Sequence, residues 1–102
     1  RGGNVLDKQL VAILRSAIAQ DTGRNDSAHR RLASVTDPRY KGLYALQQAR
    51  LLYAEGEYGR ALREIEKVGD MEDKALCKLA EKCCIAMDDY KKAYYYATKQ
   101  TI

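Results

Sequence analysis

The histidine and the three cysteines of this 102-residue chain are its first candidates for nucleophilic or metal chemistry: His29, Cys77, Cys83 and Cys84. A cysteine thiolate beside a histidine is the simplest chemistry that such residues support. His29 lies next to two arginines on a short predicted amphipathic helix, and no local motif around it or around Cys83 indicates such a pair. We therefore expect no catalytic residues, and we expect that the chain is not an enzyme.

Metal binding is the second chemistry to consider. Cys77 and Cys84 are seven residues apart and would share one helix face. A structural zinc site needs four ligands, so it would require the one remaining cysteine and the only histidine as well, and no Cys-x-x-Cys spacing occurs. We expect no metal and no other cofactor, and we expect the cysteines to be small packing residues. Their odd number within one predicted helix favours a reducing compartment, the cytoplasm or the nucleus.

Composition indicates a single globular domain over residues 1–102. The chain is 46% hydrophobic and 31% charged, which fits a folded protein better than a disordered one. No apolar run approaches the roughly 18 residues of a membrane span, so we expect no membrane contact. The net charge of +4 favours acidic partners without requiring nucleic acid.

The spacing of apolar residues predicts helices almost throughout, because they recur every three or four positions and nowhere alternate as in a strand. The predicted helices cover about residues 5–20, 27–35, 38–54, 58–68, 70–87 and 89–100. The candidate cap of the first helix is Asn4, and that of the second is Asp26 or Ser27. Asp37 followed by Pro38 is the clearest helix start, and Gly69 is expected to end the fourth helix in a left-handed conformation.

The predicted turns recur at a regular interval. Gly23, Gly56 and Asp88 are 33 and 32 residues apart. An alanine follows each turn residue by five positions: Ala28, Ala61 and Ala93. This periodicity divides the chain into three units of two helices each, at about residues 4–35, 37–69 and 70–102. We expect the alanines to be buried where paired helices cross.

The turn pattern resembles that of the tetratricopeptide repeat. Gly56-Glu-Tyr58-x-x-Ala61 is echoed by Asp88-Asp-Tyr90-x-x-Ala93, and the repeat typically has glycine, an acidic residue, tyrosine and then alanine at these places. The resemblance implies an all-α fold, a right-handed stack of about three antiparallel helical hairpins. It also implies a scaffold or adaptor that binds a protein or peptide.

A narrower resemblance covers residues 43–61, 74–84 and 89–93. These segments are similar to the N-terminal repeats of the helical-repeat subunits of the anaphase-promoting complex. The small helical-repeat chaperones of type III secretion are an alternative family, so a secretion-type chaperone is an alternative function.

The tetratricopeptide resemblance also implies a groove along the first helix of each unit. Mapped onto this chain, the groove-lining residues are Gln47, Arg50, Tyr53, Lys78, Lys82 and Ile85. Their positive charge would suit an acidic or carboxylate-bearing peptide. The alternative is a solvated helix face. The asparagines of a two-carboxylate clamp are absent from these helices.

Three consecutive tyrosines, Tyr94, Tyr95 and Tyr96, lie in the last predicted helix. At about 100° per residue they span roughly 200°, so at least one must leave the hairpin core. Tyr90 and Tyr94 are expected to pack on the preceding helix, and Tyr95 and Tyr96 to widen that apolar face. We predict an assembly interface here: residues 88–102 should form a homodimer or contact another subunit. The alternative is that a downstream helix covers it.

RNA binding is the rival function. Its candidate contacts are basic residues clustered in one region: Arg24, Arg30, Arg31, Arg39 and Lys41. Helical-repeat RNA readers recognise about one base per unit, so three units would specify very little. We therefore expect a protein or an acidic peptide as the partner and do not expect nucleic acid.

Overall fold

A computed structural model describes residues 7–69 and 73–100 of the chain. Within these residues the regular structure is helical and no strand occurs. The α-helices are α1 (Lys8–Asp21), α2 (Asn25–Ala33), α3 (Lys41–Ala54), α4 (Tyr58–Glu66), α5 (Lys74–Ala86) and α6 (Tyr90–Lys99). A 3₁₀ turn, η2 (Pro38–Tyr40), leads into α3. The predicted all-α fold class is confirmed.

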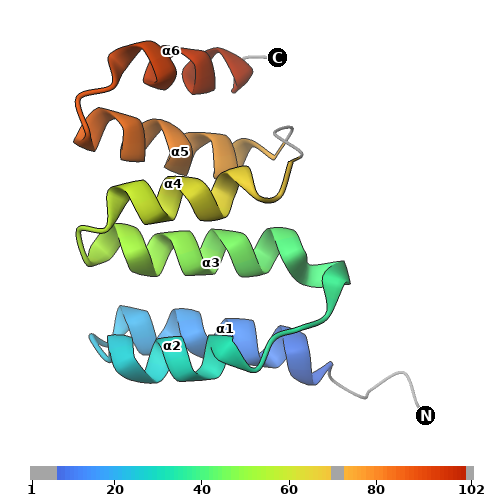
Figure 1. The fold of residues 1–102 in the computed structure, drawn as a ribbon. Coiled ribbons are helices and arrows are strands. Elements are labelled where there is room, and N and C mark those ends of the chain that lie inside the picture. Colours follow the sequence, from blue (N-terminus) through green and yellow to red (C-terminus); the bar gives the residue numbers. More distant parts are fainter. Residues whose placement is uncertain (1–6, 70–72, 101–102) are drawn as a thin grey trace.

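The helices pair as antiparallel hairpins, α1 with α2, α3 with α4 and α5 with α6, and the hairpins stack on one another (Figure 1). In this stack α3 contacts both α1 and α5, while α2 packs on α3 and α4 packs on α5. The principal dimensions are 49 × 30 × 19 Å. The first helices of the three hairpins, α1, α3 and α5, thus form a continuous series.

The three turn residues within the hairpins share one backbone conformation. Gly23, Gly56 and Asp88 have φ values of 78°, 80° and 59°. Asp88 is the only residue other than glycine with a positive φ in the described ranges. Aspartate tolerates this left-handed conformation better than most residues do. The third turn therefore keeps the geometry of the first two without a glycine.

The helix ends follow the predicted capping signals in part. Asp37 caps the start at Pro38, where its carboxylate accepts a hydrogen bond from the Arg39 N–H, as predicted. Gly69 has the predicted positive φ, 80°, after α4 has ended. The prediction that Asp26 or Ser27 caps α2 is wrong, because the helix already begins at Asn25.

Two other helix starts differ from the prediction. Asp7 caps α1 by accepting a hydrogen bond from the Gln9 N–H, and the predicted cap, Asn4, lies outside the described residues. Asp73 caps α5 by accepting hydrogen bonds from the N–H groups of Ala75 and Leu76. The predicted start of this helix at residue 70 also lies outside them. In both cases a nearby aspartate carboxylate satisfies N–H groups that have no partner within the helix.

The core is divided between the two junctions of the stack. One cluster joins α1 and α2 to Leu51 of α3, and the other joins α3 and α4 to α5 and α6. The alanines of the repeat pattern, Ala28, Ala61 and Ala93, are buried as predicted. Cys77, Cys83 and Cys84 are also buried, in agreement with the predicted packing role.

Candidate functional site

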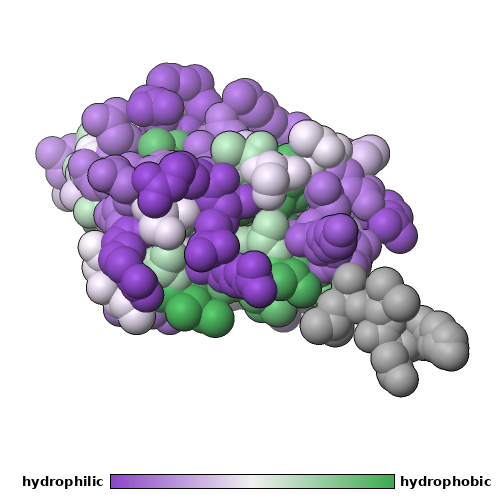
Figure 2. Space-filling model, turned by 90° about the horizontal axis from the view of Figure 1, so that it is seen from below, coloured by the Kyte–Doolittle hydropathy of each residue, from purple (hydrophilic) through white to green (hydrophobic). Residues whose placement is uncertain are grey.

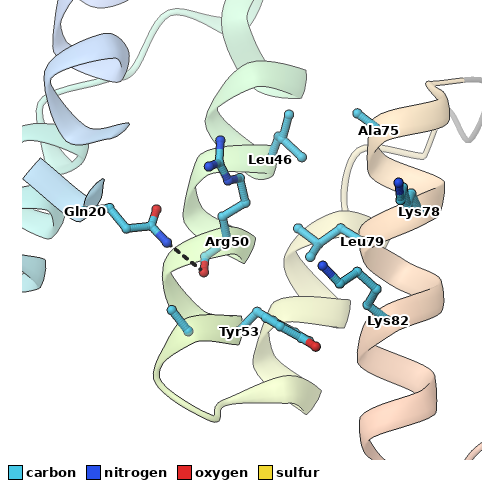
Figure 3. A pocket seen from close by; sticks show the side chains of 9 residues that line it. Gln20, Leu46, Arg50, Tyr53, Ala75, Lys78, Leu79 and Lys82 are labelled. Atoms are coloured by element: carbon cyan, nitrogen blue, oxygen red, sulfur yellow. Dashed lines mark hydrogen bonds between the residues drawn. The ribbon is translucent and has the colours of Figure 1, made fainter. Parts of the chain in front are cut away.

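A hollow of about 360 Å³ opens between α3 and α5, and α1 closes one side of it. Its lining residues come from the first helix of each hairpin: Gln20, Leu46, Arg50, Tyr53, Ala54, Ala75, Lys78, Leu79 and Lys82. Figure 3 shows Leu79 and Lys82 extending from α5 toward α3, with Arg50 and Tyr53 opposite them. We call this hollow the groove. Of the six residues predicted to line such a groove, four do so: Arg50, Tyr53, Lys78 and Lys82.

The groove combines cationic side chains with an apolar floor. Leu79 belongs to the larger core cluster, and Leu46 and Tyr53 pack against it, so the floor is fixed by the fold. Arg50, Lys78 and Lys82 are exposed above it. An anionic ligand with an apolar side chain could use both surfaces at once.

None of the three groove cations forms an ion pair within the described residues, whose ion pairs involve other basic groups. The Lys82 ammonium lies 5.4 Å from the centroid of the Tyr53 ring, a distance that permits a cation–π interaction. Tyr53 is held in turn by an edge-to-face contact with Tyr58, whose ring centroid is 5.2 Å away. The groove therefore presents positive charge that no carboxylate of the described chain neutralises.

Gln47 was predicted to line the groove, but its side chain is buried between α1 and α3. Its amide Nε2 donates to Gln20 Oε1 at 2.9 Å and to Ser16 Oγ at 3.3 Å. Ser16 Oγ donates to the Ala28 carbonyl at 2.9 Å, and Gln20 Nε2 donates to the Arg50 carbonyl at 3.4 Å (Figure 3). Gln47 thus holds Gln20, a lining residue, against α3.

Sequence reasoning missed five lining residues: Gln20, Leu46, Ala54, Ala75 and Leu79. Gln20 precedes Gly23 by three positions, as Tyr53 precedes Gly56. Extending the repeat alignment to the first unit would therefore have identified it. Leu46 carries no charge, and only its place opposite Leu79 reveals its role. Ile85, also predicted to face the groove, is exposed outside the lining.

The consecutive tyrosines of α6 divide between surface and core. Tyr94 and Tyr95 are 73% and 52% exposed, whereas Tyr96 is buried. The Tyr96 hydroxyl donates to Glu66 Oε2 at 2.9 Å, and burial together with this carboxylate raises the Tyr96 pKa. The expectation that Tyr90 and Tyr94 pack on α5 is wrong, because both side chains are largely exposed. Ala93 faces inward as predicted, and Tyr96, which was expected to widen the exposed face, is buried beside it.

The residues with potential for nucleophilic or metal chemistry lie apart from the groove. His29 Nε2 is 3.1 Å from both carboxylate oxygens of Glu55, between the first and second hairpins. Burial raises the pKa of the Cys83 thiol to about 11. In the described ranges no group of three histidine, cysteine or acidic side chains is arranged to hold a metal ion.

Every helix in the described part of the chain is too short or too polar to cross a membrane. Comparisons with protein-family models, with curated proteins and with solved structures give no match to this chain. The groove and its chemistry are therefore the basis for assigning a function.

Proposed function

We propose that this protein is a tetratricopeptide-like interaction module whose groove binds an acidic peptide segment of a partner protein. The observation that carries the proposal is the grouping of Arg50, Lys78 and Lys82 around an apolar floor, without carboxylates to neutralise them. The arrangement favours a peptide in which carboxylates flank one apolar side chain.

Each part of the groove has a distinct role in this proposal. The Arg50 guanidinium can bind a carboxylate through two parallel hydrogen bonds. Lys78 and Lys82 act as point charges that attract a second acidic group. The floor formed by Leu46 and Leu79 receives the apolar side chain, whose transfer from water contributes affinity. The volume of about 360 Å³ lies at the small end of known ligand pockets and suits a short segment.

Fluorescence anisotropy with a labelled peptide of one leucine flanked by glutamates would test the proposal, with a lysine-flanked peptide as the reference. Arg50→Glu combined with Lys78→Glu should weaken binding of the acidic peptide about tenfold or more. The matched control is Arg30→Glu combined with Lys91→Glu. It makes the same charge change on exposed residues outside the groove and should alter the affinity about twofold or less.

Equal weakening by the two double variants would show that net charge alone drives binding and would contradict the proposal. A labelled single-stranded RNA serves as the alternative ligand in the same assay. Tighter binding of this RNA, with a steep loss between about 50 and 200 mM salt, would assign the chain to the RNA-binding class instead.

A further inference from the structure

The two ends of the hairpin stack expose apolar residues at positions that are buried inside it. The comparison uses distances along the sequence from the turn residues Gly23, Gly56 and Asp88, which share one backbone conformation. Residues nine and five positions before the second and third turns are buried: Gln47, Leu51, Leu79 and Cys83. These positions therefore belong to the junctions between hairpins.

The contacts of these residues show what covers them. Leu51 belongs to the core cluster of α1 and α2, and Gln47 forms hydrogen bonds with Ser16 and Gln20 of α1. Leu79 and Cys83 belong to the cluster that includes residues of α3 and α4. In both junctions, the preceding hairpin buries the positions nine and five residues before the turn.

The same two positions of the first unit are Leu14 and Ile18, which are 54% and 59% exposed. Terminal units of repeat proteins commonly have a polar outer face, whereas these two positions of α1 are apolar. Figure 2 looks onto the α1–α2 end and shows hydrophobic surface there, bordered by hydrophilic residues. We call Leu14 and Ile18, with the half-buried Val11 beside them, the leading face.

The opposite end has a corresponding exposed residue. Leu62, six positions after Gly56, is buried in the cluster that joins α4 to α5. The residue six positions after Asp88 is Tyr94, which is 73% exposed. Tyr90 and Tyr95 are exposed on the same helix. We call Tyr90, Tyr94 and Tyr95 the trailing face.

We propose that the leading face of one copy receives the trailing face of a second copy, so that copies stack head to tail. Within the chain, each junction already buries the residues that correspond to Leu14 and Ile18, nine and five positions before the turn, against the preceding hairpin. The contact between copies would repeat this packing, whereas a two-fold dimer would pair like faces that never meet within the fold. Head-to-tail contacts of this kind are heterologous and leave a free face at each end, so association continues beyond the dimer.

Sedimentation velocity from about 10 to about 500 micromolar would test this, because association of this type grows with protein concentration. The parent chain should increase in mass across the series. Ile18→Glu and Tyr94→Glu each place a charge on an exposed position of one face and should each remain monomeric. Leu43→Glu, on an exposed side chain of the central hairpin, is the matched control and should associate like the parent.

Mixing the two face variants distinguishes head-to-tail stacking from a two-fold dimer. The Ile18→Glu protein keeps an intact trailing face, and the Tyr94→Glu protein keeps an intact leading face. Their equimolar mixture should form a 1:1 heterodimer that grows no further. A monomeric parent, a mixture that remains monomeric, or association of Ile18→Glu by itself would each overturn the proposal. Circular dichroism melting of each variant verifies that it is folded.

Discussion

Replacement of the Gln47 side chain should show how much the buried amide contributes to the junction between the first two hairpins. Gln47 is 3% exposed, and its Nε2 donates to Gln20 Oε1 at 2.9 Å and to Ser16 Oγ at 3.3 Å. A net hydrogen bond contributes about 0.5–1.5 kcal/mol. The hydrogen bond to Ser16 is long and therefore weak, so the two hydrogen bonds together should contribute about 1.5 kcal/mol.

Gln47→Ala also removes buried volume. A cavity left by partial relaxation adds a further cost, which brings the expected loss of unfolding free energy to about 2–3 kcal/mol. Gln47→Leu retains most of that volume. It leaves no buried group without a partner, because Ser16 still donates to the Ala28 carbonyl and the half-buried Gln20 can reach water. We expect Gln47→Leu to cost about 1 kcal/mol or less.

Urea unfolding followed by circular dichroism measures these differences, provided that the denaturant slope stays constant among variants. Gln48→Ala is the matched control. It makes the same chemical change on the adjacent half-buried residue and should cost less than about 1 kcal/mol. If Gln47→Ala costs no more than this control, the buried amide is not an anchor of the junction and the reasoning fails.

Three further predictions concern the turn, the helix crossing and the thiols. Asp88→Gly should stabilise the protein by about 0.5 kcal/mol, because glycine adopts the left-handed conformation without steric strain, while the greater entropy that glycine loses on folding offsets part of this gain. A lower melting temperature would contradict this. Ala61→Leu should cost about 1–3 kcal/mol by overpacking a fully buried site, and an unchanged urea midpoint would show that the crossing can accommodate the larger side chain. The Cys83 thiol, with a pKa raised to about 11, should react slowly with an aromatic disulfide reagent at pH 8 and rapidly in urea; equal rates would show that this site opens readily.

The amino-acid sequence predicted the helices and most of their ends because those features depend on nearby residues. Asp37 and Pro38 start a helix through a carboxylate and a fixed φ within one turn of chain. The turn interval located Gly23 and Gly56, and Asp88 adopts the same backbone conformation. The start of α2 was mispredicted because Arg24 occupies the cap position without a side-chain hydrogen bond, so no capping residue marks the site.

The tertiary structure decided which side of each helix faces a neighbour. Successive residues on a helix differ by about 100° in direction, so a small rotation exchanges buried and exposed positions. This explains why Gln47 is inside the junction while Leu46 lines the groove, and why Tyr96 is buried while Tyr94 is exposed. Residue type by itself does not set that rotation, because glutamine and tyrosine are both stable in either environment when their polar atoms are hydrogen-bonded. Packing against the adjacent hairpin sets it: Gln47 is held by α1, and Tyr96 belongs to the cluster that joins α3 and α4 to α5 and α6.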